Sequence, residues 1–156
     1  MLTVEDYGAL GAFRYQIRHF LRFSELAARQ EGLEPQQHQV LLGVRSLDEP
    51  GGPTVRQLAD HLLIRHHSAV GLIDRLAEHG LVERVRGDAD RRQVRVRLTP
   101  QGEQKLRRLS VIHRTELRNS GPRLVEALGA LLRGLSAEAV SLNKEEDVRE
   151  AQARRS

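Results

Sequence analysis

Apolar residues recur at helical spacing through the first part of the chain. From position 4 to about 30 the pattern rests on large side chains three or four residues apart: Leu10, Phe13, Ile17, Phe20 and Leu21. This spacing predicts a long helix that ends at Gly32. A second helix is predicted to begin at Pro35 and to stop before the segment DEPGGP at 48–53, because two prolines and two glycines cannot continue a helix.

The next two helices are short and close together. Thr54, followed three residues later by Gln57, fits a capping box at the start of a third helix. Its predicted inward side chains have the spacing i, i+3, i+4, i+7: Val55, Leu58, Ala59 and Leu62. The same spacing returns a few residues later in Ala69, Leu72, Ile73 and Leu76. That fourth helix is predicted to end at Gly80, and the two together form a helix-turn-helix.

A β-hairpin is predicted after the fourth helix. The runs LVERVR and QVRVRL flank the polar segment GDADRR, and the second run alternates apolar and basic residues. Thr99 and Pro100 then predict the start of another helix, with threonine as N-cap. That helix is expected to break near 120–122, with a further amphipathic stretch beyond it. The order predicts a mainly α protein, a winged helix-turn-helix with a two-stranded β wing.

Composition and charge narrow the class of protein. The 156 residues are about one domain, and the absence of cysteine excludes disulfides and thiolate chemistry. No apolar run reaches the ~18 residues of a membrane span, and no signal peptide is evident, so we expect a cytoplasmic protein. The net charge of +4 is mild evidence for a polyanionic partner. Arginines concentrate in the middle of the chain, at Arg75, Arg84, Arg86, Arg91, Arg92, Arg95 and Arg97.

From 33 to about 106 the sequence resembles the MarR family of winged helix-turn-helix transcriptional regulators. The resemblance is carried by LEPQQHQVLL, by VRQLADHLLIRHHSAVGLIDRLAEHGLVERV and by GDADRRQVRVRLTPQGEQKL, with "DRL..HGLVER" and "D.DRR...V.LT..G" as the most specific pieces. Three residues depart from the family pattern. Leu63 stands at a turn position that often has glycine, Arg65 where an acidic or small polar residue is common, and Gly71 in place of a polar or basic side chain.

The outward face of the fourth helix is the predicted DNA-contacting surface. An α-helix fits the major groove, and the first turn of a recognition helix usually makes the contacts. The candidate residues on this helix are Arg65, His66, His67, Ser68, Val70, Gly71 and Arg75. The histidine pair could instead be a solvated helix start, and Val70 could either touch a thymine methyl or be half-buried. Asp74 is expected to pair with a nearby arginine.

The hairpin tip is the second predicted contact. The resemblance implies that Arg92, with Arg91 beside it, enters the minor groove while Asp90 braces the loop; a solvated charged turn is the alternative. Arg86 is also placed among the DNA-binding residues. Arg86 and the remaining hairpin arginines are expected to contact phosphates or to lie at the rim of the DNA interface rather than to read bases. These remaining arginines are Arg84, Arg95 and Arg97.

The terminal segments, about 4–30 and 103–145, carry apolar stripes. These contain more apolar residues than the core of the predicted winged-helix DNA-binding lobe, at about 34–99, would require. They could form intramolecular core; the resemblance implies N- and C-terminal dimerisation helices of a homodimer, within a single domain spanning 1–156. It also implies a small anionic or phenolic effector in a cleft. Candidate lining residues are Arg14, Tyr15, Arg18, His19, His38 and His113.

Other function classes have less support. Only histidine and carboxylate ligands are available, and the adjacent His66 and His67 point to different faces, so we expect no metal and no cofactor. No phosphate-binding loop, HExxH or nucleophile motif indicates an enzyme. The sequence therefore predicts a sequence-specific regulator, a ligand-responsive repressor on a pseudo-palindromic DNA operator. The alternative is a winged-helix protein-interaction module without specific DNA binding.

Overall fold

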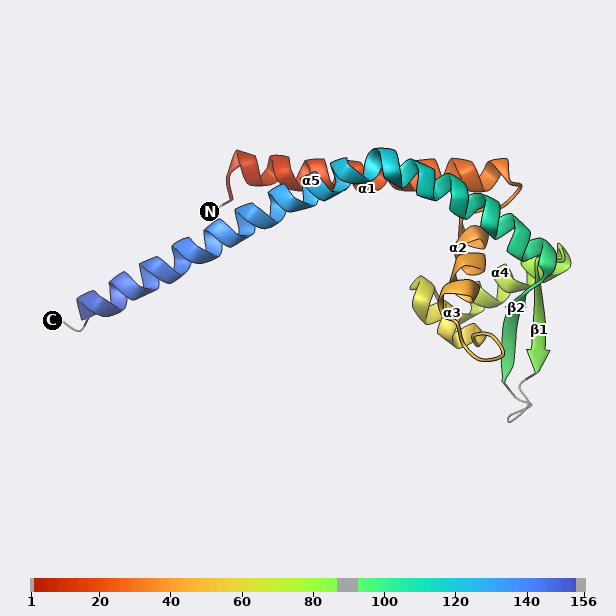
Figure 1. Ribbon diagram of the computed structural model, residues 1–156. Coiled ribbons are helices and arrows are strands. Elements are labelled where there is room, and N and C mark those ends of the chain that lie inside the picture. Colours follow the sequence, from red (N-terminus) through yellow and green to blue (C-terminus); the bar gives the residue numbers. More distant parts are fainter. Residues whose placement is uncertain (1, 87–92, 154–156) are drawn as a thin grey trace. The chain divides into compact units, whose positions relative to one another are not determined.

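The computed structural model describes residues 2–86 and 93–153, with side chains as far as residue 135. Over these residues the chain has five helices and a two-stranded sheet (Figure 1). In chain order the elements are α1 (Val4–Gln30), α2 (Pro35–Ser46), α3 (Val55–Leu62), α4 (His66–Glu78), β1 (Val82–Arg86), β2 (Val94–Leu98) and α5 (Pro100–Ala153). This order confirms the predicted mainly α, winged helix-turn-helix architecture.

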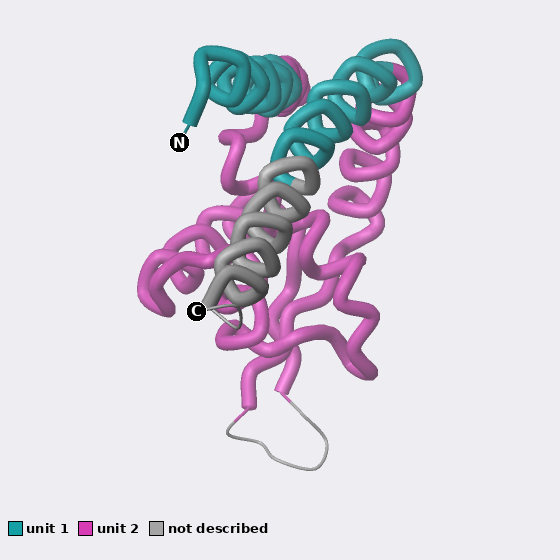
Figure 2. The backbone as a smooth tube through the Cα atoms, turned by 90° about the vertical axis from the view of Figure 1, so that its left-hand side faces the viewer, with its two compact units in different colours: residues 1–22, 116–156 teal, residues 23–115 magenta. Residues whose placement is uncertain are grey.

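The chain divides into two compact units (Figure 2). Unit 1 comprises residues 1–22 and 116–156, and unit 2 comprises residues 23–115. Helices α1 and α5 therefore each contribute a segment to both units. Unit 2 contains α2, α3, α4 and the sheet, which are the elements of the predicted winged helix.

The hydrophobic core lies in unit 2. Its fully buried large side chains come from helices and sheet alike: Val40, Leu41, Leu58, Ile73, Leu76, Val96 and Leu109. The inward face predicted for α4 is confirmed, since Ala69, Leu72, Ile73 and Leu76 are all buried. In α3 the predicted apolar residues are buried too, except Leu62, which is half-buried. Helical periodicity therefore identified the packed faces of both helices of the helix-turn-helix.

Local capping explains where the helices begin and end. Thr54 Oγ1 accepts from the Gln57 amide at 3.2 Å and Gln57 Oε1 accepts from the Thr54 amide at 2.8 Å, which confirms the capping box. Thr99 Oγ1 accepts from the Gly102 amide at 3.1 Å and donates to the Gly80 carbonyl at 2.6 Å. Gly80 follows the C-cap of α4 with φ 68°, the left-handed conformation that glycine tolerates.

The sheet is a single antiparallel pair, with Val82 opposite Leu98 and Arg86 opposite Val94. Gly102 lets the start of α5 pass close to this sheet, because a Cβ there would lie 1.9 Å from the Leu81 carbonyl oxygen. β2 ends at Leu98 and α5 begins at Pro100, so the hairpin leads into α5 with only one residue between them.

The expected helix break near 120–122 is wrong, because α5 continues from Pro100 to Ala153. Pro122 lies inside the helix, where its missing N–H removes one backbone hydrogen bond. A Cβ at Gly121 would meet nothing within 4 Å, and Ser120 Oγ donates back to the Glu116 carbonyl at 3.0 Å. Gly121 and Pro122 therefore lie within a continuous helix, and the loss of one backbone hydrogen bond does not end α5 there.

Leu63 makes the turn between α3 and α4 in a left-handed conformation, with φ 55° and ψ 40°. Its side chain is 92% exposed, so it contributes little packing. At a left-handed position leucine is less favourable than glycine by about 1 kcal/mol in the folded state. Glycine has more conformational freedom to lose on folding, which offsets part of this difference. The turn therefore keeps the geometry that glycine favours, although leucine occupies it.

We expect Leu63→Gly to raise the free energy of unfolding by about 0.5 kcal/mol, because it relieves the left-handed strain without removing buried area. Urea denaturation followed by circular dichroism measures the change. Leu42→Gly, on an exposed position within α2, is the matched control and should lower stability by about 1 kcal/mol. A loss of stability in Leu63→Gly comparable to that of the control would contradict the assignment of strain.

Candidate nucleic-acid interface

Helix α4 presents its polar face to solvent. Its first turn exposes His66, His67 and Ser68, and Arg75 is exposed about two turns later. The N-cap residue Arg65 is extended, with φ −69°, and makes no side-chain cap hydrogen bond. The start of α4 therefore leaves backbone N–H groups uncapped by Arg65, and such groups bind phosphate.

Two of the predicted contact residues are less accessible than the rest. Val70 is half-buried and packs against the core, which favours its structural alternative over a thymine contact. Gly71 is half-buried as well, and a Cβ there would lie 3.7 Å from Arg75 Nη1. The glycine therefore leaves space beside the Arg75 guanidinium on the exposed side of α4.

The wing is joined to the recognition helix by an ion pair. Arg84 Nη2 on β1 donates to Asp74 Oδ1 on α4 at 2.6 Å. This confirms the expectation that Asp74 pairs with an arginine. Arg84 was expected at a phosphate or at the rim, and at least one of its N–H donors is used in this contact with Asp74. Arg86, at the end of β1, is exposed.

The two arginines of β2 also donate to protein acceptors. Arg95 Nη1 donates to the Gly52 carbonyl at 2.8 Å, and Arg97 Nε donates to the Gly51 carbonyl at 2.9 Å. The predicted tip residues Asp90, Arg91 and Arg92 lie outside the described residues, so their role stays a prediction.

The six candidate ligand residues fall into two groups. Arg14, Tyr15, Arg18 and His19 lie on the part of α1 in unit 1, where all four are exposed. The rings of Tyr15 and His19 lie 6.2 Å apart. His38 and His113 lie in unit 2, where the structure brings them together with a ring-centroid distance of 4.9 Å.

Ser24 completes this histidine cluster and was missed in the sequence. His113 Nδ1 lies 2.7 Å from the Leu109 carbonyl, which can only accept, so this nitrogen carries the proton. In neutral His113 the other nitrogen, Nε2, then accepts from Ser24 Oγ at 2.8 Å. His38 is buried, and its Nδ1 has no hydrogen-bond partner among the described residues.

Burial lowers the pKa of His38 to about 4, with a smaller contribution from the neighbouring His113. At neutral pH His38 is therefore uncharged. The His38 side chain lies beside His113 of α5 within unit 2.

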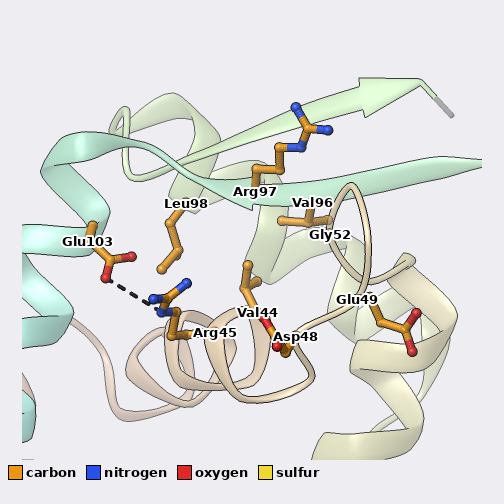
Figure 3. A pocket seen from close by; sticks show the side chains of 9 residues that line it. All are labelled: Val44, Arg45, Asp48, Glu49, Gly52, Val96, Arg97, Leu98 and Glu103. Carbon is orange, nitrogen blue, oxygen red and sulfur yellow. Dashed lines mark ion pairs between the residues drawn. The ribbon is translucent and has the colours of Figure 1, made fainter. Parts of the chain in front are cut away.

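A cavity of about 260 Å³ lies between the end of α2, the loop that follows it, β2 and the start of α5 (Figure 3). Val44, Val96 and Leu98 form its apolar part. Arg45 and Glu103, which also line it, form an ion pair in which Nε and Oε1 lie 3.7 Å apart. None of the six candidate ligand residues lines it. Among the described residues no group of three or more His, Asp or Glu side chains could hold a metal ion.

The helix-turn-helix followed by a hairpin defines a winged-helix protein. Residues 31–93 match the model of the MarR family, in agreement with the resemblance seen in the sequence. The proteins similar to this chain whose role is named are regulators of transcription. None of the helices in the described part of the chain is long and apolar enough to cross a membrane.

Proteins of related sequence or fold include regulators of transcription. The chain is 40% identical over 62 residues to the uncharacterized HTH-type transcriptional regulator YsmB of Bacillus subtilis (strain 168), a match that covers 40% of this chain and 42% of YsmB. The fold is shared with AbsC, a MarR family regulator from Streptomyces coelicolor, at 22% identity and TM-score 0.69 over 92% of this chain and 98% of AbsC. CouR, a transcriptional repressor bound to a 23-mer DNA duplex, is 29% identical with TM-score 0.61, over 81% and 87% of the two chains.

The lowered pKa of His38 makes stability depend on pH. Because the unfolded state binds a proton below pH 6.5 and the folded state only near pH 4, the contribution of His38 to stability falls as pH falls through this window. Between pH 7.5 and pH 5 the loss is about 2 kcal/mol. We expect His38→Leu to remove this part of the pH dependence in urea unfolding. His67→Gln, at an exposed position, is the control; an unchanged pH profile in His38→Leu would contradict the assignment.

Proposed function

We propose that the chain is a sequence-specific DNA-binding regulator that acts as a homodimer and a ligand-responsive repressor in the cytoplasm. The observation that carries the proposal is the exposed first turn of α4 beside an arginine-rich wing in a MarR-family lobe. CouR, which shares this fold, is a repressor bound to a DNA duplex.

In this proposal α4 enters the major groove of the operator. His66, His67 and Ser68 face base edges and the nearest phosphates, while Arg65 and Arg75 add charge at the two sides of the contact. Backbone N–H groups at the start of α4 hold a phosphate. Arg86 contacts the backbone, and the wing tip, with Arg91 and Arg92 braced by Asp90, reaches the minor groove.

The homodimer is supported by the lack of buried side chains in unit 1. None of the described side chains at 2–22 and 116–135 is buried, whereas unit 2 has a full core. The exposed apolar residues of unit 1 are Leu2, Val4, Tyr7, Leu10, Tyr15, Leu21, Leu117, Val125, Leu128, Leu132 and Leu135. Amphipathic helices are stabilised mainly by burying their apolar face, so a second copy would supply the missing surface.

We expect the wild-type protein to have about twice the 17.6 kDa mass of one chain in light scattering after gel filtration. Val125→Glu changes the most exposed apolar residue among the described side chains of α5. It should weaken the dimer at least tenfold, because it places a charge in an apolar interface. Asn119→Glu, an exposed polar position of the same helix, is the control. A wild-type protein that stays monomeric at tens of micromolar would overturn the proposal.

The ligand response rests on the candidate residues of the two units. Arg14, Arg18 and His19 offer positive or hydrogen-bonding groups on α1, and Tyr15 offers an aromatic surface, which suits a small anionic or phenolic effector. His38 is buried within unit 2 and is therefore not accessible to an effector arriving from solvent. The exposed group on α1 is therefore the better candidate for the first contact with an effector.

The proposal is tested by fluorescence anisotropy with a DNA fragment from upstream of the protein's own gene and a scrambled fragment of equal length. We expect tighter binding to the upstream fragment. Binding should fall by about three orders of magnitude from 50 to 200 mM salt if six phosphates are contacted. Equal binding to both fragments would contradict an operator in that region. Absence of binding at low salt would favour the alternative, a protein-interaction module.

A further inference from the structure

The segment before α3 runs beside β2. The Val96 amide donates to the Pro53 carbonyl at 2.9 Å, and Thr54 forms an isolated antiparallel bridge with Arg95. Because Thr54 is the N-cap of α3, these contacts attach the first helix of the helix-turn-helix to the second strand of the wing. We call residues 51–54 together with 95–97 the wing clamp.

Two arginine side chains strengthen the wing clamp from one face of β2. Arg95 and Arg97 are two residues apart on a strand, so their side chains leave on the same face, while Val96 between them is fully buried. They donate to consecutive carbonyls, those of Gly52 at 2.8 Å and Gly51 at 2.9 Å. Each arginine thus directs a charged donor toward the protein's own backbone.

The glycine pair makes this arrangement possible. Gly51 and Gly52 have φ values of 79° and 95°, which side-chain-bearing residues rarely adopt. A Cβ at position 52 would lie 2.2 Å from the Val96 carbonyl oxygen, so only glycine permits the close approach. Gly52 lies against Val96 on β2 (Figure 3). The loop backbone is therefore shaped to present its carbonyls to the strand.

We propose that Arg95 and Arg97 are positioning residues, which fix the wing relative to the helix-turn-helix and thereby set operator discrimination without contacting DNA. The Arg84–Asp74 pair makes the equivalent connection between β1 and α4. With both strands attached, β1 and β2 are held relative to α3 and α4 within unit 2. This inference rests on the proposed DNA-binding function, and it is an alternative to the expectation that both arginines are phosphate contacts or rim charges.

The test compares Arg95→Gln, Arg97→Gln and the double variant with Arg86→Gln, an exposed arginine assigned to the DNA backbone. Affinity for the upstream and scrambled fragments is measured over a range of salt concentrations. If the two arginines position the wing, affinity for the preferred fragment falls at least tenfold, scrambled binding stays within about twofold and the salt slope is unchanged. Arg86→Gln should weaken both and reduce the salt slope by about one.

Equal weakening of both fragments with a reduced slope in Arg95→Gln and Arg97→Gln would overturn the proposal. If the double variant loses its cooperative thermal transition, Arg97→Gln decides, because the Arg97 side chain is exposed and its loss should be tolerated. Amide hydrogen exchange gives a readout that needs no DNA. The Val96 amide should exchange at least tenfold faster in the variants and stay protected in Arg86→Gln, so failure of the wing clamp and failure of DNA binding are separable.

Discussion

The buried face of α4 is the constraint on which the rest of unit 2 depends. Ala69, Leu72, Ile73 and Leu76 are each at most 3% exposed and contribute to the same core as α2, α3 and β2. Since successive helical side chains are about 100° apart, burying this stripe determines which residues face outward. The core therefore selects the residues available for contact with DNA, and their chemistry determines what can be read.

The two units differ in where their stability comes from. Unit 2 has a core of its own, closed by capping at α3 and α5 and by the ion pair of Arg108 with Glu31 at 3.0 Å. The described side chains of unit 1 have no buried member, although large apolar residues recur along both of its helical segments. Isolated helices gain little from propensity alone. In the proposed homodimer, association of the two chains would supply the surface that unit 1 lacks, and oligomeric state and folding of the terminal segments would be one equilibrium.

Features with a local signal could be predicted from the sequence. The helical stripes, the capping box at Thr54 and the alternation in 94–98 all depend on residues within one turn or one strand, and each was confirmed. The misplaced break at 120–122 has the opposite cause, because a local signal from Gly121 and Pro122 did not outweigh the rest of a long helix.

Contacts between distant residues gave no such signal. Arg95 meets Gly52 across 43 positions, and His113 meets Ser24 across 89. Nothing in the periodicity of either segment indicates its partner, so the role of Arg95 and the cluster around His113 required the fold.

The wing shows why a count of basic residues overstates direct DNA contact. Arg84, Arg95 and Arg97 all lie on its strands, yet each donates to an acceptor within unit 2. Arg95 and Arg97 donate to neutral backbone carbonyls, which hold the two guanidinium groups against the loop before α3. Arg84 lies against a carboxylate, which cancels most of its charge at a distance. The role of an arginine on this hairpin is therefore decided by the acceptor that it already holds, and its charge alone does not make it a DNA contact.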